Sequence, residues 1–134
     1  MYRVKFYQCT FDNVNISTLS LSECDFYECN FIKSDLERAQ IYQCDYQKCN
    51  FVDLSLYECE MKETTLDQCN FKKCYFHETW IWECDIINPE FLDSKIVEAY
   101  LDESNFEITK PNWSMVIDGD RHLKEIVKLI EGNI

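Results

Sequence analysis

Nine cysteines and two histidines are the side chains of this 134-residue sequence best suited to metal binding or nucleophilic catalysis. Pairs such as Cys24 and Cys29 resemble zinc-ligand pairs, with four residues between the partners. A structural zinc site needs four converging ligands, whereas these cysteines are spread evenly from Cys9 to Cys84. Neither His77 nor His122 is placed to serve one of them as a catalytic base. We therefore predict no metal site, no cofactor and no catalytic residue.

Composition indicates a single domain from a reducing compartment. The number of cysteines is odd, and no apolar, cleavable segment follows Met1, so we expect reduced thiols and a cytoplasmic location. No run reaches the roughly 18 apolar residues of a membrane span. The net charge of −12 opposes direct binding to nucleic acid or anionic lipid, because both need a basic footprint. A protein partner of basic character, or solubility alone, fits this charge better.

The spacing of the cysteines follows a repeat of five residues. All nine phenylalanines share one register of this period: Phe6, Phe11, Phe26, Phe31, Phe51, Phe71, Phe76, Phe91 and Phe106. All nine cysteines share a second register, two places earlier: Cys9, Cys24, Cys29, Cys44, Cys49, Cys59, Cys69, Cys74 and Cys84. Every fifth position from Phe6 to Phe106 is apolar. A helix or a simple strand would show another period, so the pattern predicts a turn repeated along a coil.

The repeated motif is a small residue, then Asp or Asn, then Leu or Phe, then two polar residues, as in Cys24-Asp25-Phe26. It resembles the pentapeptide-repeat family over about residues 4–109. The resemblance implies an all-β solenoid, a right-handed quadrilateral β-helix of about five coils, in which residues twenty apart stack at ~4.8 Å. Cysteines would then fill small inward positions as apolar groups. The sequence departs from the family pattern in having almost no glycine in the repeats and a proline at inward position 89, near which we expect a slightly irregular coil.

The period ends before the C-terminus. We therefore divide the chain into a pentapeptide-repeat β-helix at 1–109 and a C-terminal segment at 110–134, with an amphipathic helix at about 120–131. The apolar face of this helix is formed by Leu123, Ile126, Val127 and Ile130. We expect the helix to cap the open end of the coil or, as the resemblance to topoisomerase-binding relatives implies, to form a homodimer contact. An exposed N-terminal edge offers a second route to pairing with another chain.

Outward positions concentrate acid and aromatic rings on one side of the coil. Stacking at twenty residues places Glu63 with Glu83 in one corner column and Glu58 with Glu78 in the next, while lysines fall on the other faces. The predicted partner-binding face comprises Tyr57, His77, Trp80, Trp82, Tyr100, Glu58, Glu78, Glu63, Glu83 and Glu103. The alternative is that these rings lie flat along the coil and only stiffen neighbouring rungs.

These features favour a non-enzymatic binding or structural module that presents the acidic, aromatic face to a protein partner. The alternative follows from the resemblance to quinolone-resistance pentapeptide-repeat proteins: a DNA mimic that modulates a type II topoisomerase, DNA gyrase. An enzyme is disfavoured, because the sequence has no nucleophile paired with a base and no Gly-rich phosphate loop. A filled solenoid core also leaves no deep cleft.

Overall fold

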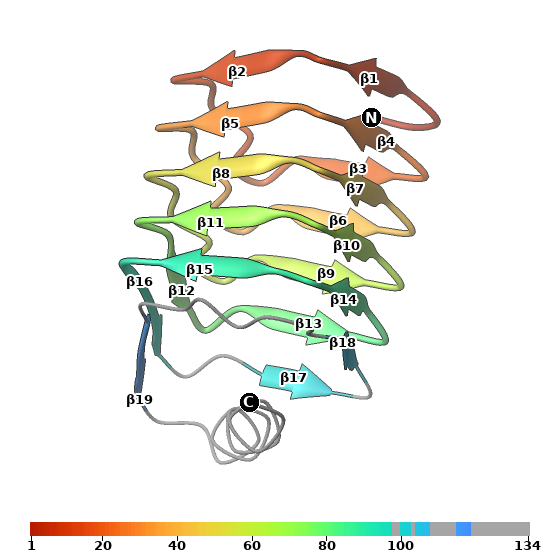
Figure 1. Cartoon of the computed structure of the whole chain (residues 1–134). Helices are drawn as coiled ribbons and strands as arrows, with labels where there is room; N and C mark the ends of the chain where they lie inside the picture. Colours follow the sequence, from red (N-terminus) through yellow and green to blue (C-terminus); the bar gives the residue numbers. More distant parts are fainter. Residues whose placement is uncertain (98–99, 103, 108–114, 119–134) are drawn as a thin grey trace.

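The computed structural model describes residues 1–97, 100–102, 104–107 and 115–118. They form an all-β solenoid of about five coils, in which each coil turns through four parallel sheets (Figure 1). Within these ranges no helix has the length and apolar character needed to cross a membrane. The predicted helix at about 120–131 and its apolar face lie outside the described residues, as does Glu103.

The four sheets are numbered in the order in which the chain first enters them. Sheet I contains β1 (Lys5–Tyr7), β4 (Asp25–Tyr27), β7 (Asp45–Gln47), β10 (Thr65–Asp67), β14 (Asp85–Ile87) and β18 (Asn105–Glu107). Sheet II contains β2 (Thr10–Asp12), β5 (Asn30–Ile32), β8 (Asn50–Val52), β11 (Asn70–Lys72) and β15 (Glu90–Leu92). Sheet III contains β12 (Tyr75–His77), β16 (Ser94–Val97) and β19 (Met115–Asp118). Sheet IV contains β3 (Ser20–Ser22), β6 (Gln40–Tyr42), β9 (Glu60–Lys62), β13 (Trp80–Trp82) and β17 (Tyr100–Asp102).

The register between coils is twenty residues through β18. Phe31 pairs with Phe51, for example, and the isolated bridges that begin sheet III follow the same step. The step becomes 21 residues only at β19, where Ile96 pairs with Ile117. The five-residue period of the sequence therefore produces the stack that the resemblance implied.

Proline 89 leaves the coil regular, contrary to the expected irregularity. The strands on either side of it, β14 and β15, keep the twenty-residue register. The reason is visible at Cys49 and Cys69, which stack at the same inward position. The ladder bonds between coils there are donated by the following residues, Asn50 and Asn70. Since the residue at this inward position gives no N–H to the ladder, a proline removes no ladder hydrogen bond.

The corners of the coil are held by residues in the left-handed region of backbone space. Every fifth residue from Arg3 to Asp93 has a positive φ, between 46° for Asn88 and 61° for Thr18. Glycine is the usual residue in this conformation, but here polar and charged side chains occupy it. All corner side chains consequently point outward, which is how the corner columns of the surface arise.

The core consists of the residues at the centre of each strand together with the small residues between strands. In sheet II the centre is a continuous column of phenylalanines whose rings stack almost in parallel, with centroids 4.8–5.1 Å apart and interplanar angles of 6–12°. The members of this ladder are Phe11, Phe31, Phe51, Phe71 and Phe91. The stacking of residues twenty apart, which the resemblance implied, is therefore present in the core.

Asp45, on β7, has the one buried side-chain polar atom without a hydrogen-bond partner among the described residues. Its Oδ1 atom is buried and accepts no hydrogen bond from any of them, whereas Oδ2 accepts one from Gln47 Nε2 at 2.9 Å. Burial, more than the nearby charges of Asp25 and Asp67, raises the pKa of the Asp45 carboxyl. The ionised form is therefore disfavoured in the folded protein relative to the unfolded chain.

We expect Asp45→Asn to raise the free energy of unfolding at pH 7 by about 1 kcal/mol, because the neutral amide carries no charge for burial to disfavour. Because the folded-state pKa of Asp45 is raised, the native carboxyl stabilises the fold fully below its unfolded pKa. That contribution is lost as the pH rises through the folded pKa. The advantage of the variant should accordingly shrink as the pH falls towards about 3.5. Urea unfolding at pH 7 and at about pH 3.5 measures the difference in free energy of unfolding between the variant and the native protein. An equal difference at the two pH values would contradict this explanation.

Candidate functional site

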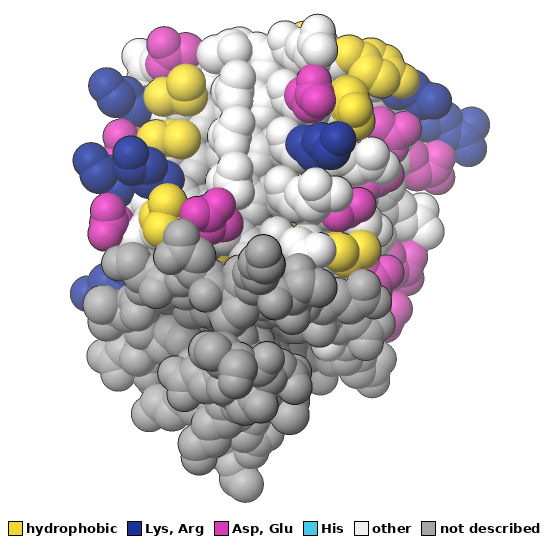
Figure 2. Space-filling model, viewed as in Figure 1, with side chains coloured by type: hydrophobic (Ala, Val, Ile, Leu, Met, Phe, Trp, Pro, Cys, Tyr) yellow, Lys and Arg dark blue, Asp and Glu magenta, His cyan; other side chains and the backbone are white. Residues whose placement is uncertain are grey.

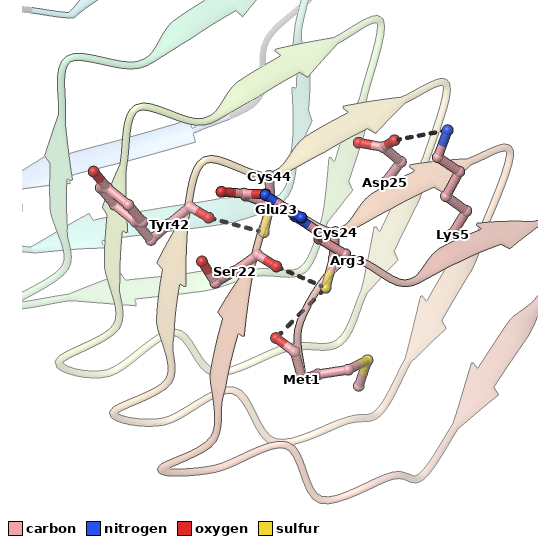
Figure 3. Close-up of polar contacts among 9 residues, drawn as sticks. All are labelled: Met1, Arg3, Lys5, Ser22, Glu23, Cys24, Asp25, Tyr42 and Cys44. Atoms are coloured by element: carbon pink, nitrogen blue, oxygen red, sulfur yellow. Dashed lines mark hydrogen bonds and ion pairs between the residues drawn. The ribbon is translucent and has the colours of Figure 1, made fainter.

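The cysteine thiols lie inside the solenoid and bond to its backbone. In the described structure every cysteine is buried except the half-buried Cys9. Apart from Cys59, each buried thiol points at the carbonyl oxygen 23 residues earlier, one coil back, as Cys74 does to Phe51 at 3.2 Å. Figure 3 shows the arrangement for Cys24, whose sulfur lies between the carbonyls of Met1 and Ser22.

Serine and threonine hydroxyls donate the same kind of hydrogen bond at equivalent positions. Ser94 donates to the Phe71 carbonyl at 3.2 Å, and Thr79 donates to the Leu56 carbonyl at 2.7 Å. The prediction that the cysteines are small inward groups is thus correct on burial. It missed that many Cys, Ser and Thr side chains there also donate weak hydrogen bonds to the preceding coil, whereas Ala39 and Leu54 fill the same register without a donor.

Most of the buried thiols are poorly suited to chemistry, although the hydrogen bond with Cys69 lowers the pKa of Cys49. Burial raises the pKa of Cys59 and Cys74 to about 12 and that of Cys44 to about 11. The hydrogen bond to Cys49, together with burial, also holds the pKa of Cys69 above its usual range. Nucleophilic attack and metal ligation both use the thiolate, so these residues are inert at neutral pH. Within the described part of the chain, no group of three or more potential metal ligands converges.

The predicted partner-binding face proves to be two neighbouring strips along sheet IV. Five of its residues gather at the corner between sheets III and IV, which we call the groove corner: Tyr57, Glu58, His77, Glu78 and Trp80. Glu63 and Glu83 lie at the next corner, between sheets IV and I. Trp82 connects the strips, because its ring centroid is 5.8 Å from that of Trp80. Tyr100 pairs with Trp80 through the backbone of β17.

Contacts between successive coils order the side chains of the groove corner. The rings of Tyr57 and His77 have centroids 5.2 Å apart, and Tyr75 lies 5.6 Å from the same histidine. His77 Nε2 is also 3.8 Å from a carboxylate oxygen of Glu78. Tyr57 and Arg38, in that order of importance, hydrogen bond to Glu58 and lower its pKa. The corner thus holds the Glu58 carboxylate ionised beside aromatic rings.

A surface groove of about 380 Å³ runs along the solenoid axis at this corner. It is lined by Arg38, Gln40, Glu58, Glu60, Glu78 and Trp80. Sequence reasoning missed Arg38, Gln40 and Glu60, since it sorted residues into separate columns. The signal was present nonetheless, because the residues between the two lining columns are the small, buried Ala39, Cys59 and Thr79. Two rows of long side chains flanking a row of short inward ones leave a groove.

Comparisons with known proteins agree with this architecture. A family model described as pentapeptide repeats matches residues 9–45 and 34–72. A crystal structure of the pentapeptide repeat protein Rfr23 from the cyanobacterium Cyanothece 51142 superposes with a TM-score of 0.72 at 12% identity, covering 85% of this chain and 91% of that one. A pentapeptide repeat protein from the Arabidopsis thaliana thylakoid lumen gives a TM-score of 0.55 at 16% identity, covering 87% and 76%. At these identities the likeness concerns the fold alone.

Two further comparisons give no information about function. No curated protein sequence matches the chain. A structure of QnrB1, described as a plasmid-mediated fluoroquinolone resistance protein, gives a TM-score of only 0.27 at 10% identity, with 98% of this chain and 96% of that chain covered. A superposition this poor carries no argument for a shared target.

Proposed function

Because the chain belongs to the pentapeptide-repeat family, whose solenoid it shares, we propose that it is a non-enzymatic binding module that engages a basic protein partner through the groove corner. The observation that carries the proposal is the exposed indole of Trp80, 40% accessible, set among carboxylates in a groove. Tryptophan and tyrosine are the residues that most often anchor protein interfaces, and carboxylates beside them select a cationic partner.

The distribution of charge supports this orientation. Sheet II, which lies across the coil from sheet IV, is seen in Figure 2 with a pale stripe of uncharged side chains along the axis, and with Lys and Arg interspersed with Asp and Glu at both margins. The stripe includes a ladder of asparagines, in which Asn50 donates to Asn30 at 2.7 Å and Asn70 donates to Asn50 at 2.9 Å. Acidic and basic side chains offset one another at these margins, whereas the groove has three carboxylates and one arginine, so a basic partner would be steered towards the groove corner.

Affinity capture with identification of the retained protein tests the proposal. We expect a partner that is retained by the native chain and lost with Tyr57→Ala plus Trp80→Ala. Raising the salt from about 0.05 to about 0.5 M should also release it, because exposed charges are screened. The matched control is Tyr7→Ala plus Tyr27→Ala, which removes two other surface rings, tilted with their centroids 6.2 Å apart, from sheet I. Equal retention by the groove-corner variant and the native chain would exclude this surface.

Gyrase binding by DNA mimicry stays a prediction that rests on the net charge of −12. A supercoiling assay with saturating protein tests it directly, and unchanged supercoiling together with unchanged quinolone inhibition would remove it.

A further inference from the structure

The groove at the corner of sheets III and IV has a graded lining along its length. Each of three successive coils contributes one pair of side chains: Arg38 with Gln40, Glu58 with Glu60, and Glu78 with Trp80. The ladder of sheet IV aligns Gln40, Glu60 and Trp80 directly, so neighbouring pairs are about 4.8 Å apart. The groove consequently runs from one cation, through three carboxylates, to an indole wall.

The cation within the groove is already neutralised. Arg38 Nε bonds to Glu58 Oε2 at 3.0 Å, and the two side chains form an ion pair. This leaves Glu60 and Glu78 as the carboxylates that determine the charge of the remaining space. Glu60 is exposed and, among the residues that the structure describes, has no side-chain hydrogen bond or ion pair. Glu78 has only the 3.8 Å contact with His77 as an ion-pair partner there.

The first coil shows how this protein holds an arginine in such surroundings. The guanidinium carbon of Arg3 lies 4.8 Å from the centroid of the Tyr2 ring, and Arg3 Nε bonds to Glu23 Oε2, on the next coil, at 2.6 Å. Figure 3 shows this Arg3 to Glu23 pair. On this solenoid a guanidinium can thus lie between an aromatic ring and a carboxylate one coil apart. Trp80 and Glu60 also place an aromatic ring and a carboxylate one coil apart, in the groove.

We propose that the groove is a subsite for an arginine side chain of the partner protein, an assignment that rests on the proposed function. The planar guanidinium would lie against the Trp80 indole and donate its N–H groups to Glu60 and Glu78. Arginine suits this site better than lysine, because its delocalised cation is less strongly hydrated, stacks on rings and forks towards carboxylates. A lysine ammonium is a hydrated point charge that gains less from the indole.

The test is an NMR titration of the full chain with three short acetylated and amidated peptides, Gly-Ser-Gly-Xaa-Gly-Ser, in which Xaa is arginine, lysine or citrulline. The readout is the indole N–H resonance of Trp80, assigned by its loss in Trp80→Phe. We expect the arginine peptide to shift this resonance, with about 10-fold weaker binding for citrulline, which keeps the shape and lacks the charge. The lysine peptide should bind about threefold more weakly than the arginine peptide.

Variants locate the binding. Glu60→Gln with Glu78→Gln should weaken binding of the arginine peptide at least about 10-fold, since both charged acceptors are lost. The matched control, Glu28→Gln with Glu90→Gln, makes the same change of charge on sheets I and II and should leave the affinity within about twofold. Equal losses in the two variants would mean that net charge, and no defined subsite, attracts the peptide, and would overturn the proposal.

Two other outcomes separate this inference from the proposed function. If the peptides bind equally, or none shifts the Trp80 resonance, the arginine subsite is wrong. A partner captured through Tyr57 and Trp80 would still stand in that case. If the arginine peptide binds as expected and no partner is captured, the subsite stands and the proposed function fails.

Discussion

Replacing Phe51 with alanine should lower the free energy of unfolding by about 3–5 kcal/mol. Phe51 is 2% exposed and its ring is stacked between those of Phe31, at 5.1 Å, and Phe71, at 4.9 Å. Truncation removes both stacking contacts and leaves a cavity in the centre of the solenoid, where neighbouring coils are fixed by their ladders and cannot collapse into it. A loss of this size is a large share of the 5–15 kcal/mol typical of a whole domain.

Phe11 provides the matched control, because it belongs to the same ladder but lies half-buried in the first coil. Within the ladder, its ring stacks only on Phe31, at 4.8 Å. Phe11→Ala should therefore cost roughly half as much as Phe51→Ala. Phe51→Leu, which keeps apolar volume and loses the stacking, should fall between Phe51→Ala and the native chain. Urea unfolding followed by circular dichroism measures all three, and an equal cost at positions 11 and 51 would contradict the ladder's role.

Alkylation should modify Cys9 at least about 10³-fold faster than Cys59 in the folded protein at pH 7.5. Cys9 is half-buried in the first coil, whereas Cys59 is fully enclosed. The Cys59 pKa of about 12 lowers the thiolate fraction by more than three orders of magnitude relative to an ordinary thiol. Burial then restricts access of the reagent as well.

Timed reaction with iodoacetamide, followed by peptide mass spectrometry, gives the rate at each cysteine. Under denaturing conditions all nine cysteines should react at similar rates. Cys9→Ser should remove the fast phase and leave the slow ones unchanged, because it keeps a small donor in the first coil. Modification of Cys59 at the rate of Cys9 in the folded protein would show that the coil opens far more readily than its packing indicates.

The repeat made the interior predictable. A five-residue period with Phe51 and Cys49 in fixed registers determines which side chains point inward, because each corner returns the chain to the same direction. The period also placed Glu58 and Glu78 in one column correctly. The expected effect of Pro89 was wrong because the sequence does not reveal which backbone N–H groups the ladder uses.

The candidate site was predictable only in part. The period identified Trp80 and the carboxylates near it, but not the groove, since a groove depends on two columns and on the small Ala39 between them. It also could not show that Arg38 would be neutralised by Glu58, because the pairing depends on side-chain rotamers across coils. Likewise, the ring contact between Trp80 and Trp82 depends on the side-chain rotamers of the two indoles.

The twenty-residue register has a consequence for how the chain reaches this structure. The backbone bonds that join coils connect residues about twenty apart, as when Asn50 donates to the Cys29 carbonyl. A first coil therefore has almost no stabilising hydrogen bonds until a second coil is wound against it. The folding nucleus must close at least one loop of about twenty residues before any ladder of hydrogen bonds stabilises it. Each later coil adds to a finished template. Folding should therefore begin with a slow nucleation step, after which the coils form one after another from that nucleus.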